Sequence, residues 1–200
     1  MYLTLLSTLA SRDGARFRAA EQAAAVVLVT ALTSIAAQVS FPLPFTPVPF
    51  TFQPMVVLVG AMVLGSRLGA ASQALYLALG IAGLPVFAAS PLLPQGAARL
   101  LGPTGGYLMS YPLAAFVTGW LAERGFDRRY LTSIAAMALG LAIVYAGGVA
   151  WLTVASQPAR SLGAALAAGV VPFVVPDVLK LVVAAGVMPG LWKITGPIAR

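Results

Sequence analysis

Six long apolar stretches, separated by short segments that carry most of the charges, leave few options for the fold. They cover residues 19–41, 50–65, 68–84, 104–122, 131–155 and 162–191. A transmembrane helix needs about 20 mostly apolar residues, within a range of roughly 17–25. The second stretch is short, and the others have the length of a span. The sequence therefore predicts an all-α membrane protein, a six-transmembrane-helix bundle in which residues 1–200 form a single integral membrane domain.

The composition excludes several other classes. Only 8 % of the residues are charged and 60 % are hydrophobic, whereas a soluble domain carries about 25 % charged residues. The net charge of +7 comes from scattered basic residues, which do not form a nucleic-acid-binding patch. The chain has no Cys and no His, which excludes disulfides, Cys/His metal sites and His acid–base catalysis. We expect no metal, no cofactor and no catalytic residues.

The distribution of basic residues predicts how the bundle is oriented in the membrane. With six spans, both termini lie on the same side of the bilayer. The residues on that side are Arg12, Arg16, Arg18, Arg67, Arg124, Arg128, Arg129, Lys193 and Arg200, against Arg99 and Arg160 on the other side. Loops rich in Lys and Arg stay in the cytoplasm, so both termini are predicted to be cytoplasmic.

Two loops on the outward side differ from ordinary turns. Residues 42–49 contain four prolines, which fix φ and offer no N–H, so this segment is expected to be extended and stiff. Residues 85–103 form a long apolar loop, and such loops are usually lids or binding loops. At the amino terminus, Met1 to Leu9 is either an interfacial helix or a tail.

Asp177 and Lys180 are the strongest signal of a site. Both fall within the sixth stretch, where ionisable residues are costly, face the bundle interior and mark functional sites. Their spacing of three residues places them side by side on one helix face. Pro172 and Pro176 precede them and bend or interrupt the helix. The alternative to a functional pair is a buried structural ion pair.

Three weaker signals accompany this pair. Gly102-Pro-Thr-Gly-Gly-Tyr107 begins the fourth stretch; its backbone N–H groups could face an anion, or it could be a turn and helix cap. Gln53 follows the proline-rich loop and is either a ligand contact or a link between helices. Ala20, Ala24 and Ala31 recur on one face of the first stretch, where they allow close approach of another helix, inside the bundle or from a separate membrane protein.

The order of several motifs resembles the BioY family, the biotin-binding substrate (S) components of energy-coupling-factor (ECF) transporters. The resemblance runs from about Ala24 to Lys180 and is carried by Pro47-Val-Pro-Phe-Thr-Phe-Gln53, Leu64-Gly65 with Gly69, Gly83-Leu-Pro-Val-Phe87, Gly102-Pro-Thr-Gly-Gly-Tyr107 and Pro172-Phe-Val-Val-Pro-Asp-Val-Leu-Lys180. It implies a six-helix bundle in the plasma membrane of a prokaryote, with an outward-facing pocket for biotin as the transported ligand. It also implies two kinds of partner, a transmembrane coupling protein and two cytoplasmic ABC-type ATPase subunits. The small-residue face with Ala20, Ala24 and Ala31 would dock on the coupling protein.

The resemblance supports Asp177 and Lys180 as binding residues. Asp177 can accept from an N–H of the ureido group of biotin, and Lys180 can donate to its C=O. The expected wall groups are Gln53, Thr104, Gly105, Gly106 and Tyr107. Arg99 is proposed for the carboxylate of biotin, because it is the arginine of the outward loop next to the glycine motif.

Two departures from some relatives concern the carboxylate end. The chain has Ser90-Pro-Leu-Leu-Pro-Gln-Gly96 in place of an Asn-containing, glycine-rich stretch, and Leu108 in place of an Arg. The open alternatives are an S component for another vitamin, a self-sufficient secondary vitamin transporter and, least favoured, an intramembrane enzyme. A secondary transporter built from inverted repeats would need a second half resembling the first, which the sequence lacks.

Overall fold

The computed structural model describes residues 4–5, 15–90, 94–155 and 159–195, and most of these are helical. The helices are α2 (Ala15–Gln38), α3 (Gln53–Leu64), α4 (Ser66–Ile81), α5 (Ala98–Leu101), α6 (Gly105–Ala122), α7 (Tyr130–Val154), α8 (Leu162–Gly169), α9 (Val171–Ala185) and α10 (Val187–Thr195). The strands β1 (Ser40–Phe41) and β2 (Phe50–Thr51) form an antiparallel hairpin. The predicted all-α character is confirmed.

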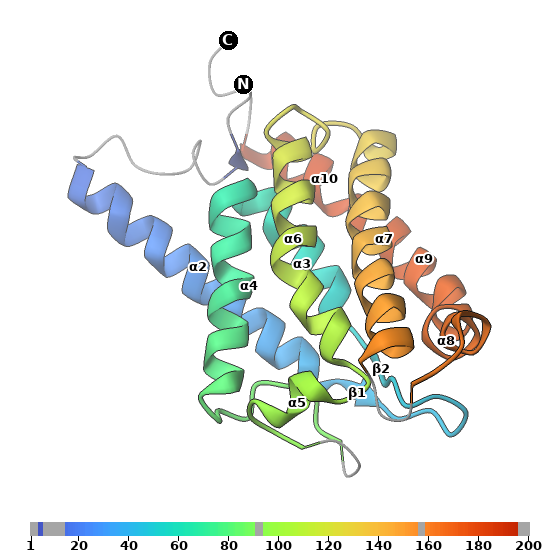
Figure 1. Cartoon of the computed structure of the whole chain (residues 1–200). Helices are drawn as coiled ribbons and strands as arrows, with labels where there is room; N and C mark the ends of the chain where they lie inside the picture. Colours follow the sequence, from blue (N-terminus) through green and yellow to red (C-terminus); the bar gives the residue numbers. More distant parts are fainter. Residues whose placement is uncertain (1–3, 6–14, 91–93, 156–158, 196–200) are drawn as a thin grey trace.

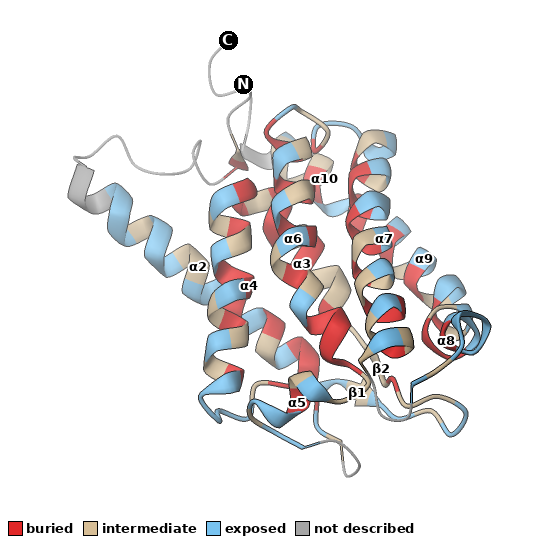
Figure 2. Cartoon of the chain, viewed as in Figure 1, coloured by how far each residue is buried: buried red, intermediate tan, exposed pale blue. Residues whose placement is uncertain are grey.

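Helix α6 lies at the centre of the bundle. It packs against α3, α4 and α7, while α2 crosses the bundle obliquely and α8, α9 and α10 cover the side of α7 (Figure 1). The buried residues line the surfaces on which these helices meet, and the outward faces of the helices are exposed (Figure 2). Three helical segments of the described residues are long and apolar enough to cross a membrane, namely Arg18–Gln38, Tyr130–Val154 and Val171–Lys193.

The helices correspond to the predicted stretches, with one clear difference. The first five stretches each contain one helix, whereas the sixth is divided into α8, α9 and α10. The first break falls at Val170, whose backbone is not helical, and Pro172 then sits in the first turn of α9, where a missing N–H costs nothing. The sixth stretch is thus helical but interrupted, and Pro172 follows the first break closely.

The hairpin and its loop lie at one end of the bundle together with α5, which we call the hairpin end. The α6–α7 turn and α10 lie at the other, the α10 end (Figure 1). The predicted outward loop 85–103 contains the short helix α5. The proline-rich loop 42–49 joins β1 to β2, and the Thr46 hydroxyl donates to the Ala168 carbonyl of α8 at 2.6 Å. Of the predicted amino-terminal segment Met1–Leu9, Leu5 is buried in the core, and residues 1–3 and 6–9 lie outside the described residues.

Gly65 makes the turn between α3 and α4 possible. Its φ of +84° is a conformation that other residues rarely adopt. The α6 backbone approaches this turn so closely that a Cβ on Gly119 would overlap the Gly65 carbonyl. The start of α4 and the end of α6 are therefore held in direct contact at the α10 end.

Candidate functional site

A cavity with about 610 Å³ of empty space, part of it open to the surroundings, lies at the hairpin end. Its lining comes from the hairpin, the loop before α6, and helices α3, α6, α7, α8 and α9. The lining residues are Val48, Pro49, Thr51, Gln53, Pro54, Ala88, Arg99, Thr104, Tyr107, Leu108, Tyr111, Val144, Tyr145, Gly169, Phe173 and Asp177. The walls are thus apolar and aromatic, with a few polar groups among them.

The carboxylate of Asp177 is the acidic group of this cavity. Asp177 lies on α9 and is 7 % exposed. Its Oδ2 accepts a hydrogen bond of 2.7 Å from the Tyr145 hydroxyl on α7, and its Oδ1 lies 2.8 Å from Lys180 Nζ. The predicted Asp177–Lys180 pair is present in the structure, and donors from two directions fix the orientation of the carboxylate.

Lys180 faces the hairpin and not the large cavity. Its Nζ donates to the Thr51 carbonyl at 2.7 Å and lies 3.5 Å from the centre of the Phe50 ring. Lys180 lines a smaller neighbouring cavity, which shares Pro54 and Asp177 with the larger one. It therefore neutralises Asp177 and ties α9 to strand β2.

Arg99 supplies the positive charge of the large cavity. It lies on α5 and is only 1 % exposed. Its guanidinium donates to the carbonyls of Ala88 and Pro94, and burial lowers its pKa. Within the described parts of the chain, no carboxylate forms an ion pair with it. A buried charge is costly unless it is paired, so the site favours an anionic group from a ligand.

Of the glycine motif, only Thr104 and Tyr107 reach the cavity. The Thr104 hydroxyl is buried and has no hydrogen-bond partner among the described residues. Gly105 and Gly106 are packing positions, because a Cβ on Gly105 would overlap the Leu100 carbonyl and one on Gly106 would overlap Trp151. The expectation that these two glycines form part of the wall is therefore not met in this structure.

Gln53 and Tyr107 line the cavity while bonded to other protein groups. Gln53 Nε2 donates to the Tyr76 hydroxyl at 2.6 Å, and the Tyr107 hydroxyl donates to the Gly169 carbonyl at 2.9 Å. The Gln53 side chain thus joins α3 to α4, and Tyr107 joins α6 to the end of α8. Both residues shape the wall and restrict its movement.

A family model described as the BioY family matches residues 8–196. The chain belongs to the BioY family.

The relatives are similar over most of their length. The probable biotin transporter BioY of Pyrococcus horikoshii is 42 % identical over 163 residues, which are 80 % of this chain and 90 % of the relative. The biotin transporter BioY of Thermotoga maritima is 44 % identical over 158 residues, 79 % of this chain and 88 % of the relative. The crystal structure of an S-component for biotin from an ECF-type ABC transporter matches with a TM-score of 0.79 and 26 % identity, covering 90 % of this chain and 95 % of that one. The predicted family resemblance is confirmed.

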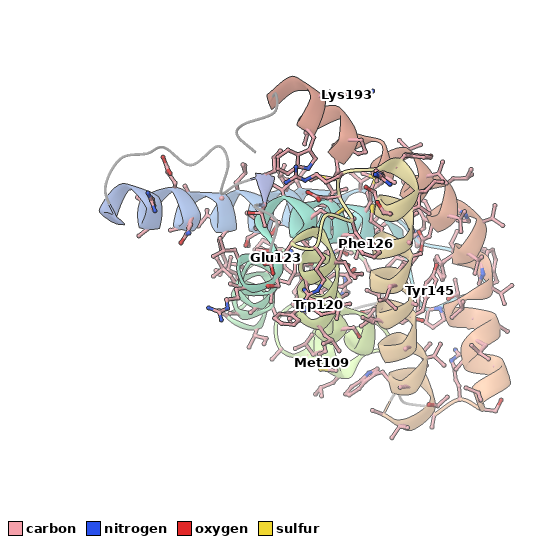
Figure 3. The ribbon with its side chains drawn as sticks, turned by 90° about the horizontal axis from the view of Figure 1, so that it is seen from above. Met109, Trp120, Glu123, Phe126, Tyr145 and Lys193 are labelled. Carbon is pink, nitrogen blue, oxygen red and sulfur yellow. The ribbon has the colours of Figure 1, made fainter. Side chains whose placement is uncertain are left out.

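The sequence did not single out Tyr145, although it is a main partner of Asp177 in this BioY-family chain. In the view along the bundle, Tyr145 lies between α7 and α9 (Figure 3). A buried tyrosine hydroxyl usually finds a partner, so a tyrosine in the middle of an apolar stretch was the available signal. Tyr76 and Phe173 were also not identified, since only the fold brings them beside Gln53 and the cavity.

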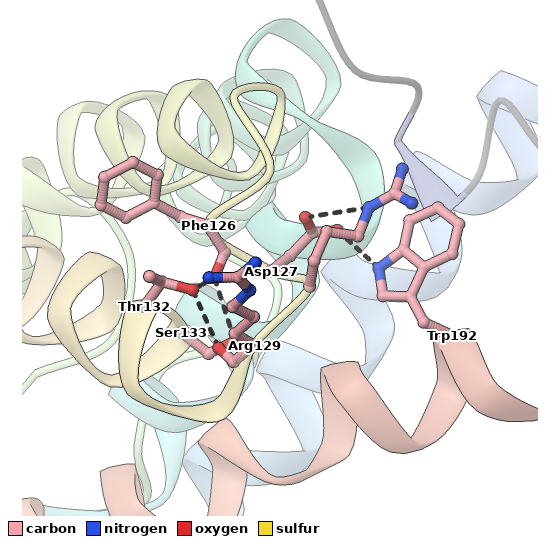
Figure 4. A network of polar contacts seen from close by, with 7 residues as sticks. Phe126, Asp127, Arg129, Thr132, Ser133 and Trp192 are labelled. Carbon is pink, nitrogen blue, oxygen red and sulfur yellow. Dashed lines mark hydrogen bonds and ion pairs between the residues drawn. The ribbon is translucent and has the colours of Figure 1, made fainter. Parts of the chain in front are cut away.

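A second buried carboxylate lies at the α10 end. Asp127, in the turn between α6 and α7, accepts a hydrogen bond of 2.7 Å from Trp192 Nε1 on α10 (Figure 4). Arg128 Nε lies 3.6 Å from the other oxygen of Asp127, and burial raises the pKa of the Asp127 carboxyl. These contacts join the turn to α10.

Proposed function

We propose that this BioY-family chain is the S component of an ECF-type vitamin transporter and that it binds biotin in the large cavity. The observation that carries the proposal is the pair of charges in this cavity. Asp177 and Arg99 both line it, and they are not paired with each other. Such a site suits a molecule with hydrogen-bond donors at one place and a carboxylate at another, which describes biotin. The names of the relatives and of the matching crystal structure support the same ligand.

In this proposal, Asp177 accepts from an N–H of the ureido ring, and Lys180 balances the charge of Asp177 from the side of the hairpin. Arg99 and the unpartnered Thr104 hydroxyl hold the carboxylate. Gln53 and Tyr107 limit the positions that the polar edge of the biotin ring can take. The fused ring and the aliphatic chain pack on the apolar wall, which includes Leu108, Val144 and Phe173.

The proposed membrane arrangement has six spans and two cytoplasmic termini. Helices α2, α3, α4, α6 and α7 are the first five spans, and α8–α10 together make the sixth. Arg67, Arg124 and Lys193 fall at the α10 end, and Arg99 falls at the hairpin end. Because basic residues favour the cytoplasm, the cavity faces outward, in the plasma membrane of a prokaryote.

The chain makes and breaks no bond in this function. It captures biotin, and a coupling protein with two ATPase subunits supplies the energy for release. Ala20, Ala24 and Ala31 are exposed on α2 and form the proposed docking face for the coupling protein. The chain needs no cofactor for binding, because biotin is the transported ligand.

Equilibrium binding of labelled biotin to the purified protein in detergent tests the proposal, with unlabelled biotin, thiamine and riboflavin as competitors. Saturable binding that only biotin displaces is expected. Displacement by thiamine or riboflavin instead would assign another vitamin. Absence of binding by the folded protein would refute a site that is complete without the coupling protein.

A further inference from the structure

The outward face of α6 carries a continuous apolar stripe. Met109, Leu113, Phe116 and Trp120 follow one another at spacings of four, three and four, and each is between 40 % and 57 % exposed. Met109 and Trp120 lie on the same side of α6 (Figure 3). At a rise of 1.5 Å per residue, the stripe is about 16 Å long, close to half of the roughly 30 Å hydrocarbon core of a bilayer.

A stacked arginine ends the stripe at the α10 end. The Arg124 guanidinium lies 3.3 Å from the centre of the Trp120 ring, and Nη1 donates to the Trp120 carbonyl at 3.0 Å. A guanidinium has five N–H donors in one plane. Arg124 is exposed, and a guanidinium held against an aromatic ring keeps further N–H donors that match the geometry of a phosphate.

A second arginine, Arg67 of α4, lies at the same end of the bundle as Arg124. The Ser66 backbone N–H and hydroxyl both donate to Glu123 Oε1, at 2.7 Å and 2.8 Å. Arg67 directly follows Ser66 in the chain, and Arg124 directly follows Glu123, so this contact brings the backbones that carry the two arginines close together. Both arginines are exposed, and neither forms an ion pair within the described residues. The neighbouring acid, Glu123, is 9 % exposed and already engaged with Ser66.

We propose that this α4–α6 face binds an anionic phospholipid of the cytoplasmic leaflet, with Arg67 and Arg124 on its phosphate and an acyl chain along the stripe. Charge complementarity selects the headgroup, because anionic lipids attract arginines close to the cytoplasmic surface. The stripe selects a lipid over free phosphate, since phosphate would use only the two arginines. Trp120 lies where the two parts meet, and tryptophan is a residue type enriched at membrane interfaces. The site rests on the membrane orientation proposed above and does not depend on biotin binding.

Native mass spectrometry of the full-length protein in detergent tests this site. The probes are phosphatidylglycerol, phosphatidylcholine with the same acyl chains, and inorganic phosphate. The wild type is expected to bind phosphatidylglycerol in preference to phosphatidylcholine. Removal of both charges in Arg67→Gln/Arg124→Gln is expected to weaken phosphatidylglycerol binding roughly thirtyfold. The control Arg18→Gln/Arg129→Gln removes two other exposed arginines and is expected to change binding less than twofold.

Three outcomes would overturn the site. An equal loss of phosphatidylglycerol affinity in the double variant and in its control would mean that general surface charge attracts the lipid. Equal binding of the two lipids by the wild type would remove the role of the arginines. If inorganic phosphate, at a concentration equal to that of the lipid, fully displaced phosphatidylglycerol, the apolar stripe would have no role in binding. Thermal unfolding of each variant shows that it is folded, and biotin affinity is expected to stay unchanged, so failure of the biotin proposal remains distinguishable.

Discussion

Two buried aspartates, at opposite ends of the same bundle, have different surroundings. Asp177 and Asp127 each accept a hydrogen bond of 2.7 Å from an aromatic residue, Tyr145 and Trp192 respectively. Asp177 borders the large cavity and is held by Lys180 on its other oxygen. Asp127 is fully buried, joins a turn to α10 and lines neither of the cavities described above. Burial and an aromatic donor are therefore not enough to mark a binding site; access to empty space makes the difference.

The same substitution at the two aspartates is expected to separate their roles most strongly. Asp177→Asn removes a charge-assisted acceptor, and such hydrogen bonds contribute about 1.5–3 kcal/mol. Biotin affinity should fall roughly 10- to 150-fold. Asp127→Asn should leave the affinity within about twofold, because it keeps an acceptor for Trp192 far from the cavity. Titration with labelled biotin measures the affinity of both variants. An equal loss of biotin affinity in the two variants would show that the two aspartates do not differ in role.

Loss of the buried cation at the hairpin end should have the next largest effect. In Arg99→Gln, biotin affinity is expected to fall at least roughly tenfold, since a charged hydrogen bond is lost. The affinity for biotinamide, which lacks the carboxylate, should change little. The empty variant should be no less stable to heat than the wild type, because a buried cation without an acidic partner is removed. An equal loss for biotin and biotinamide would place the carboxylate elsewhere.

Removing one tyrosine hydroxyl should give a smaller effect that depends on the end of the bundle. Tyr145→Phe removes a donor that orients the Asp177 carboxylate, and biotin binding is expected to weaken roughly fivefold, less than in Asp177→Asn. Tyr130→Phe is the matched control, because the Tyr130 hydroxyl donates to the Val182 carbonyl at 3.0 Å, outside the lining of the cavity. Isothermal titration of the two variants checks the difference, and similar affinities would remove the role of Tyr145.

The smallest predicted effect is a pH dependence of stability at the α10 end. Burial raises the folded-state pKa of Asp127 above its ordinary value of 3.8, so the folded protein binds a proton more tightly than the unfolded chain. This contribution to stability is present at low pH and is lost as the pH rises from about 3.8 through the folded-state pKa. Thermal unfolding in detergent at a series of pH values should show this loss in the wild type and not in Asp127→Asn. Parallel pH profiles would contradict it.

Local rules predict much of the fold and one half of the site. Apolar length identifies the helices, and the spacing of three residues places Asp177 beside Lys180. The residues of other helices that contact this pair depend on how the helices pack, and a local sequence pattern does not contain that information. Tyr145 meets Asp177 only because α7 packs beside α9, and Gly106 is a glycine because Trp151 lies against it. Within the glycine motif, Gly105 and Gly106 serve helix packing, while Thr104 and Tyr107 line the cavity.

Pro172 connects a gap in one helix to the architecture of the hairpin end. In an uninterrupted helix, residues 172 and 173 would donate their N–H groups to the carbonyls of Ala168 and Gly169. Pro172 has no N–H, and Phe173 donates to Val170 instead. The two vacated acceptors receive the hydroxyls of Thr46 and Tyr107. Because the amide nitrogen of Pro172 carries no hydrogen, hydroxyl groups from residues more than 60 positions away in the chain can bond to these carbonyls. The covalent structure of one proline ring therefore helps to determine the position of the proline-rich loop.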